Sequence, residues 1–387
     1  MNNKKNLKFS LISFLYYSQP AFALAFIPLY CKHLSFSAEE IALTTSAIDL
    51  GTVFGTLFFS HYLLKYFSAK LLLPKIGLLR VITLLPLLFI SSFYLFLFFW
   101  LLNCLLSRAA NYLLEVQALQ LDHDRKLSFS LVRSIGSGGF VVITFFSGLA
   151  LEKYGIYSSL LLFLSATVLF YLCCFSIVKE FSEINYSKHD ALVESGRTPR
   201  IVYFITFLYA LSWLSHGGYY VYFSIYLKSL GWDGNEIALA WNIGVLAEIL
   251  LFLSFAFLKK HFSLERIIQL SLLLTVLRWL IIYACKSKYI LFFSQILHAA
   301  TFGSLYLASL QLIFAKVSPR KRDKGQGILI GVGAGFGTFC GRIVFGYLAG
   351  GIEQELNFNN LFLYSAVFAG VAFVLSIRMK VEKKLTP

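Results

Sequence analysis

The stretch FIPLYCKHLSFSAEEIALTTSAIDLG, residues 26–51, recurs in altered form as FSIYLKSLGWDGNEIALAWNIGVLAE, residues 223–248. The four residues EIAL at 40–43 return unchanged at 236–239, about half of the 387-residue chain further on. KYFS at 65–68 then corresponds to KHFS at 260–263, at nearly the same offset. A repeat of this length predicts two structurally related halves that run in the same sense.

The composition is that of a protein that spans a membrane. Hydrophobic residues make up 58% of the chain and charged residues 14%, whereas soluble domains carry roughly 25% charged residues. The mean hydropathy is +0.74, and long apolar runs recur along the whole sequence, which predicts an all-α membrane protein. A transmembrane β-barrel would alternate apolar and polar residues in segments of about ten, and the sequence shows no such pattern.

The apolar runs predict twelve transmembrane helices, six in each half. The polar segment 179–199 divides the chain near its middle. We therefore expect an N-terminal six-helix half at 1–178, a linker at 179–199 and a C-terminal six-helix half at 200–387. The predicted spans are 7–31, 37–63, 70–90, 92–118, 127–150, 156–178, 200–228, 235–258, 264–285, 288–315, 325–350 and 358–378.

The distribution of Lys and Arg predicts the orientation. One set of alternate loops, to which we assign Arg80, carries most of them, whereas the opposite set carries Lys32, Lys153, Lys228, Lys286 and Lys288. The positive-inside rule then places both termini and the linker in the cytoplasm, with the chain in a cell inner membrane. The net charge of +15 reflects this orientation and contact with anionic lipid, so we expect no nucleic-acid partner.

One charged stretch stands out among the apolar runs: RAANYLLEVQALQLDHDRKLSFSLVRSIGSGG, residues 108–139. Arg108, Asn111 and Glu115 have the spacing of one helix face, and Arg133 lies on the next predicted helix. A charge at mid-bilayer costs roughly 2.5–3.5 kcal/mol unless it meets an opposite charge or a wet cavity. We interpret these four residues as half of a substrate site. The alternative is that Glu115 and Arg133 lie at the cytoplasmic surface and end their helices.

Three ionisable residues lie inside predicted spans of the C-terminal half: Glu248, Arg278 and His298. A carboxyl group among leucines, as at Glu248, can take up and release protons, and a histidine titrates near neutral pH. We therefore predict that these residues couple transport to protons. The alternatives are a permanent ion pair between Glu248 and Arg278, and a structural hydrogen bond at His298.

Further candidates come from an aromatic helix face, an acid and a last arginine. His216 and Tyr220 share a face with Ser212, and rings with polar tips suit an aromatic or sugar-like ligand. The alternative is ordinary packing in a chain that is 17% aromatic.

Asp49 has two possible roles. It pairs with an arginine, Arg108 or Arg342, or it carries protons. Arg342 follows a glycine-rich run, which favours close helix packing, and it is a candidate for a substrate carboxylate.

The six cysteines show no metal-ligand spacing, and no arrangement of a nucleophile with a base is apparent. We therefore expect that the protein is not an enzyme and that it binds neither a metal ion nor a cofactor.

Several motifs together resemble the major facilitator superfamily, and within it the 3-phenylpropionate transporter group, a relative of lactose permease. FSLVRSIGS at 129–137 is similar to the Tyr-Gly-x-Val-Arg-x-x-Gly-Ser signature of that group. The spacing of Glu115 and Arg133 resembles the sugar-binding pair of lactose permease, and that of Arg278 and His298 resembles its proton-coupling network. Two features depart from the pattern: Thr301 replaces a carboxylate, and HYLLKYF at 61–67 lacks the acid of the superfamily's loop signature.

The resemblance implies a monomeric secondary transporter that works by alternating access, with its substrate bound between the two halves near the membrane midplane. It implies symport of protons with a small molecule, for which an aromatic carboxylate such as 3-phenylpropionate is favoured. A sugar or nucleoside is the alternative substrate. A sensor or assembly factor built on the same scaffold is a further alternative.

Overall fold

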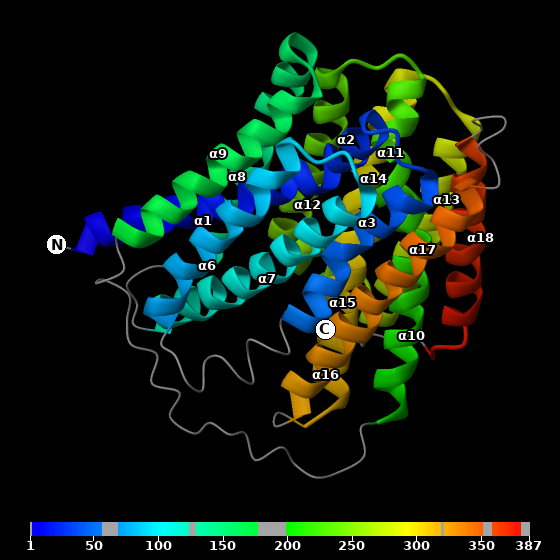
Figure 1. Ribbon diagram of the computed structural model, residues 1–387. Helices are drawn as coiled ribbons and strands as arrows, with labels where there is room; N and C mark the ends of the chain where they lie inside the picture. Colours follow the sequence, from blue (N-terminus) through cyan, green and yellow to red (C-terminus); the bar gives the residue numbers. More distant parts are fainter. Residues whose placement is uncertain are drawn as a thin grey trace. The chain divides into compact units, whose positions relative to one another are not determined.

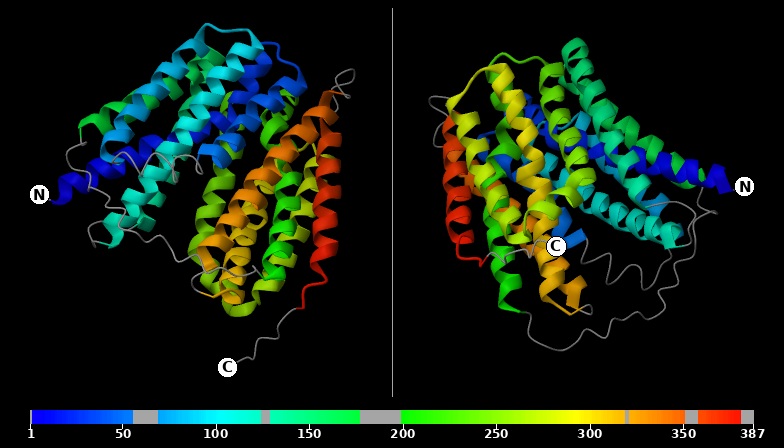
Figure 2. Two further views of the ribbon diagram at one scale, coloured as in Figure 1. Left: turned by 60° about the horizontal axis from the view of Figure 1, so that its bottom comes forward. Right: turned by 180° about the vertical axis from the view of Figure 1, so that it is seen from behind.

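The computed structural model describes residues 2–55, 69–123, 129–176, 199–318, 321–350 and 358–380. These residues form helices joined by short turns, and no strand occurs among them (Figures 1 and 2). The protein is therefore an all-α membrane protein, as its composition predicts. Nine helices of the described ranges are long and apolar enough to cross a membrane, or ten if the bent pair Leu7–Ala25 and Ile27–His33 is one span. The predicted total of twelve and the orientation of the termini stay predictions.

The chain forms two compact units. Unit 1 consists of Met1–Ser187 together with Gly231–Leu239, and unit 2 consists of Lys188–Leu230 together with Ala240–Pro387. The predicted linker lies outside the described residues except for its last residue, Pro199. The division into halves at that linker stays a prediction.

Unit 1 is built from long helices around an apolar core. Its second long helix begins with a capping box, in which Ser37 and Glu40 each accept the backbone N–H of the other. Pro28 near the start of the short second helix accompanies a 47° bend from the first. The elements are α1 (Asn2–Ala25), α2 (Ile27–His33), α3 (Ala38–Leu50), the π-helical η1 (Gly51–Gly55), α6 (Ala69–Leu84), the 3₁₀ turn η3 (Leu85–Leu88), α7 (Phe93–His123), α8 (Phe129–Tyr154) and α9 (Ile156–Ser176).

The described part of unit 2 is also built from helices, several of which are interrupted by turns or π-helical segments. The elements are α10 (Arg200–Ser215), α11 (Gly217–Ser229), α12 (Gly234–His261), whose first residues belong to unit 1, α13 (Leu264–Ala284), α14 (Lys288–His298), the π-helical η5 (Ala299–Ser304), α15 (Leu305–Lys316), α16 (Arg322–Ile328), the π-helical η7 (Leu329–Phe336), α17 (Gly337–Gly350) and α18 (Asn359–Ser376).

A glycine contact holds the first long helix of each unit against a later one. In unit 1, Gly139 of α8 lies against the backbone carbonyl of Phe14 in α1, where a methyl group would not fit. In unit 2, Gly341 of α17 lies in the same way against the carbonyl of Leu214 in α10. Gly333, Gly337 and Gly341 of the glycine-rich run thus pack closely on α10, whereas an added methyl group at Gly327 or Gly331 would meet no described atom within 4 Å.

The assignment of Arg80 to a cytoplasmic loop is wrong. Arg80 lies in the last turns of α6, and its side chain is only 1% exposed. Helix α6 packs against α7 and α9, so this charge is enclosed within unit 1.

Candidate functional site

The most polar part of the interior of unit 2 surrounds Arg278 of α13, whose side chain is fully buried. Its Nε donates to the carbonyl of Ser294 at 3.1 Å, and its Nη2 donates to Oε1 of Gln295 at 3.0 Å. Its Nη1 lies 3.1 Å from Nδ1 of His298 and 3.4 Å from the hydroxyl of Thr301. All four partners lie on α14 and η5, so one guanidinium ties two helical segments to α13.

Two aromatic rings complete the surroundings of this guanidinium. Its Cζ lies 4.4 Å from the ring centre of Tyr219 and 4.7 Å from that of Trp279, which is cation–π geometry. The Tyr219 hydroxyl also donates to Oε1 of Gln295 at 2.9 Å. The cation is therefore held by hydrogen bonds and rings. Within the described residues it makes no ion pair with Glu248, so the alternative of a permanent pair between them is wrong.

His298 lies at a break in the helix of the tenth predicted span, residues 288–315. His298 ends α14, and the following residues, Ala299–Ser304, form a π-helical turn. Such turns occur frequently at functional sites because they re-aim side chains. Glu248 of α12 lies at this turn, since a methyl group on Gly303 would be 3.6 Å from the Glu248 side chain. Two predicted proton-coupling residues, Glu248 and His298, thus lie on either side of one irregular turn.

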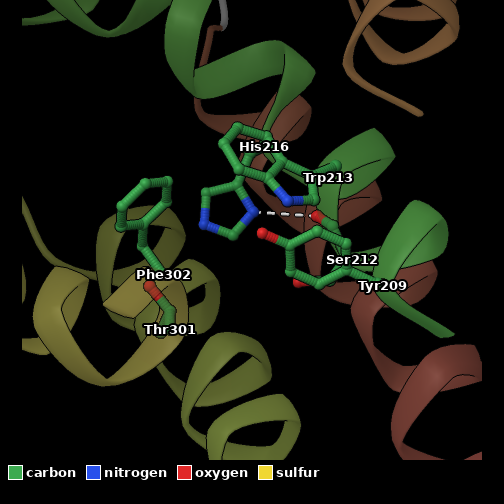
Figure 3. A pocket seen from close by; sticks show the side chains of 6 residues that line it. All are labelled: Tyr209, Ser212, Trp213, His216, Thr301 and Phe302. Carbon is green, nitrogen blue, oxygen red and sulfur yellow. Dashed lines mark hydrogen bonds between the residues drawn. The ribbon is translucent and has the colours of Figure 1, made fainter. Parts of the chain in front are cut away.

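A narrow gap between side chains, without room for a water molecule, lies beside the Arg278 cluster, and we call it the pocket of unit 2 (Figure 3). His216 lies at the break between α10 and α11, and its Nδ1 is 2.8 Å from the carbonyl of Ser212. Because a carbonyl only accepts, Nδ1 carries the proton, and within the described residues Nε2 has no hydrogen-bond partner. In Figure 3 the imidazole lies between Phe302 and the side chains of α10. The pocket is lined by Tyr209, Ser212, Trp213, His216, Thr301 and Phe302.

Tyr220 connects this pocket to a second arginine. Its ring stacks with those of Trp213 and His216, in each case with 6.0 Å between ring centres. The guanidinium of Arg342 also lies over the Tyr220 ring, with Cζ 5.5 Å from the ring centre. Arg342 is 2% exposed, so its charge is enclosed as well. The structure thus brings five of the predicted site residues of unit 2 into one region: His216, Tyr220, Arg278, His298 and Arg342.

In unit 1 the predicted site residues meet along α7. Oε1 of Glu115 accepts from Nδ2 of Asn111 at 3.2 Å and from the Tyr17 hydroxyl at 3.5 Å. The Tyr16 hydroxyl donates to the carbonyl of Ser107 at 2.8 Å. These contacts form a polar face between α1 and α7 whose groups can donate to or accept from a ligand.

Three other predicted residues of unit 1 are described only in part. Nε of Arg108 has no hydrogen-bond partner among the described residues. Asp49 is buried in the last turn of α3, and its pairing with Arg108 or Arg342 stays a prediction. Arg133 lies on α8, but its side chain is outside the described residues, as are residues 61–67 of the loop signature.

Several partners that the structure supplies are not among the predicted site residues. Gln295 and Tyr219 hold Arg278, and Trp213 and Phe302 line the pocket. The three aromatic residues are of types common in this chain, which is 17% aromatic. A glutamine one helical turn before His298 is the signal that was available for Gln295. Within the described residues, no group of three or more His, Cys, Asp and Glu side chains could hold a metal ion.

Comparison with known proteins identifies the family. The chain matches the MFS_1 like family over residues 6–360, and it belongs to that family. It is 30% identical over 102 residues to the "Probable 3-phenylpropionic acid transporter" of Escherichia coli (strain K12), a match that covers 26% of this chain and 27% of that protein. It is 27% identical over 232 residues to the "Uncharacterized transporter YwbF" of Bacillus subtilis (strain 168), covering 56% of each. The chain thus matches about a quarter and about half of the lengths of these relatives.

Solved structures share the fold. The nucleoside transporter NupG superposes with a TM-score of 0.79 at 18% identity, covering 97% of this chain and 99% of that one. The POT family transporter PepTSo superposes with a TM-score of 0.75 at 11% identity, covering 96% of each. The protein is a multi-pass membrane transporter of the major facilitator type, and its family and structural neighbours are transporters.

Proposed function

We propose that this protein is a secondary active transporter that carries a small aromatic carboxylate, such as 3-phenylpropionate, together with protons. The observation that carries the proposal is the composition of unit 2 around this pocket, where aromatic rings surround His216 next to the enclosed cations Arg278 and Arg342. The pocket is closed in this conformation, and we assign substrate binding to a conformation in which it is wider. A flat apolar ring packs on Trp213, Tyr220 and the other rings, whereas a carboxylate is stabilised by cations and N–H donors. The named relative in Escherichia coli supports the same substrate class.

The two arginines of unit 2 have different parts in this proposal. Arg278 already donates to four acceptors, so it orients His298 and Gln295 and supplies a fixed positive charge. Arg342 lies against Tyr220, at the edge of the aromatic cluster around the pocket. We therefore assign the substrate carboxylate to Arg342, stacking with the substrate ring to His216, and the orientation of the coupling residues to Arg278.

Glu248 and His298 are the groups that we assign to proton coupling. Both lie at the π-helical turn η5, whose irregular backbone also contributes Thr301 and Phe302 to the pocket. Protonation of Glu248 removes one negative charge beside the substrate region. A change in charge at this place alters the relative free energies of the transporter's conformations, and thereby couples the proton to the substrate. The loop charges support an inner membrane location with both termini in the cytoplasm, and we propose a monomer.

A sugar or nucleoside is the second candidate substrate, and one observation favours it. The face formed by Tyr17, Asn111 and Glu115 in unit 1 offers hydroxyl, amide and carboxylate groups, which are suited to ligand hydroxyls. A solved structure with the same fold is that of a nucleoside transporter.

Uptake into proteoliposomes with an imposed pH gradient tests the proposal. We expect accumulation of 3-phenylpropionate, and less of disaccharides and nucleosides offered in the same panel. Glu248→Gln should abolish gradient-driven accumulation, whereas the matched change Glu39→Gln at an exposed residue of α3 should have no effect. Accumulation of a sugar or nucleoside alone would favour the second candidate. Absence of any flux in folded protein would contradict both.

A further inference from the structure

A buried arginine in unit 1 has no part in the site described so far. The guanidinium of Arg80 donates from Nη2 to Oδ1 of Asn103 on α7, at 3.4 Å, and its Cζ lies 5.9 Å from the ring centre of Tyr16 on α1. Asn103 is fixed in turn, since its Nδ2 donates to the carbonyl of Arg80 and to the hydroxyl of Thr83, both at 3.1 Å. Arg80 is thus held at the centre of three helices of unit 1.

The same arrangement occurs around Arg278 in unit 2. Arg80 and Asn103 are 23 residues apart, and so are Arg278 and its partner Thr301. In both units the arginine lies over a tyrosine ring from an earlier helix of the same half, Tyr16 in one case and Tyr219 in the other. The internal repeat therefore extends to a buried cation with a polar partner on the next long segment.

The two cations differ in how fully their N–H groups are used. Arg278 has partners at Nε, Nη1 and Nη2. Among the described residues, Nε and Nη1 of Arg80 have no hydrogen-bond partner, although the side chain is only 1% exposed. A buried charge and buried donors without acceptors are costly, and inside membrane helices such groups generally serve function. The missing component is an acceptor, and a negatively charged one fits best.

A chain of contacts links Arg80 to the predicted substrate residues. The ring of Tyr16 meets that of Tyr17 edge-on, with 5.1 Å between ring centres. The Tyr17 hydroxyl then donates to Glu115. Because the Glu115 carboxylate accepts from Tyr17 and Asn111, this acid and the cation are engaged with different neighbours.

We propose that Arg80 is a specificity-determining residue, which binds the substrate carboxylate within unit 1 at a different step of the transport cycle from its binding at Arg342. This inference rests on the proposed transport of an aromatic carboxylate. Tyr16 covers the guanidinium on the side of α1, so the proposed binding at Nε and Nη1 requires a displacement of that ring. The hydrogen bond from Nη2 to Asn103, which in turn donates to Thr83, keeps the guanidinium in place.

Binding of a charged and a neutral ligand to purified protein tests this role. Isothermal titration would compare 3-phenylpropionate with 3-phenylpropanamide, which has the same ring and chain without the charge. We expect Arg80→Gln to weaken binding of the acid by about tenfold or more, the loss of a charge-assisted hydrogen bond, and to change binding of the amide by less than about twofold. Arg80→Lys, which keeps the charge, should lose less, and it keeps the test valid if the glutamine variant does not fold. Arg266→Gln, at an exposed position of α13, is the matched control.

Three other outcomes would contradict the inference, and each has a different meaning. Equal losses for acid and amide would mean that Arg80 only supports the structure of the site. Unchanged binding of the acid in Arg80→Gln would remove Arg80 from the site and leave the proposed substrate class intact. Failure of the wild-type protein to bind the carboxylate would contradict the proposed function itself, and this role of Arg80 with it.

Discussion

Arg278 in unit 2 and Arg80 in unit 1 lie on corresponding helices of the repeat, and each contacts a tyrosine and a polar residue 23 positions further on. Arg278 has a partner for each of its nitrogens, whereas the side chain of Arg80 makes one long hydrogen bond among the described residues. The two units thus share a buried arginine at corresponding positions, but the hydrogen bonds of these two arginines differ. In one, the cation organises its neighbours; in the other, donors remain for a ligand.

The largest expected effect is on stability when each arginine is replaced. Arg278→Gln removes the guanidinium that donates to Ser294, Gln295 and Thr301 in a buried site, so we expect a loss of roughly 3 kcal/mol in the free energy of unfolding. Arg80→Gln should stay within about 1 kcal/mol of wild type, because it removes an uncompensated charge along with one hydrogen bond. Thermal unfolding in detergent measures both, and equal losses would contradict the difference between the two cations.

Glycine contacts should behave alike in the two units, in contrast to the arginines. Gly139→Ala and Gly341→Ala each place a methyl group against a backbone carbonyl, of Phe14 and Leu214 respectively. We expect each to cost about 2 kcal/mol, since overpacked helices must separate. The controls are Gly138→Ala and Gly370→Ala, at glycines with no described atom within 4 Å of an added methyl group. Destabilisation by the controls to the same extent would indicate a general effect of alanine.

His216 tests whether this part of unit 2 binds the substrate ring. His216→Ala removes a ring that stacks with Tyr220 and that we assign to stacking with the substrate, so we expect binding of 3-phenylpropionate to weaken by about tenfold. Titration calorimetry measures the change. His261→Ala, at an exposed position near the end of α12, is the control and should bind as wild type does.

The smallest effect is expected at the support of Arg80. Thr83→Val keeps the shape of the side chain and removes a hydroxyl that accepts from Asn103 and donates to the carbonyl of Arg80. Loss of this pair should lower the free energy of unfolding by about 1 kcal/mol and weaken acid binding slightly. A change in acid binding as large as that of Arg80→Gln would mean that the network, and not the cation, determines specificity.

The sequence predicted what depends on local pattern. The recurrence of EIAL revealed the repeat, and hydropathy revealed the membrane helices, because both are properties of consecutive residues. Spacing along one helix also placed Asn111 beside Glu115. The proximity of Arg278 and His298 followed from resemblance to a family, since their contact joins two helices.

The environment of Arg80 could not be read in this way. The distribution of Lys and Arg places it with the loop charges, whereas its burial depends on Asn103 and Tyr16 from other helices. The same holds for the pocket of unit 2, whose lining comes from α10 and from a π-helical turn that no local pattern announces.

Simultaneous recording of substrate and proton movement in one vesicle preparation tests the account most directly. On addition of 3-phenylpropionate to proteoliposomes without an imposed gradient, we expect the external pH to rise as the acid enters. In Glu248→Gln the pH change should vanish, while exchange of labelled for unlabelled substrate continues. Entry of 3-phenylpropionate without proton movement in the wild type, or its failure to enter at all, would contradict the account.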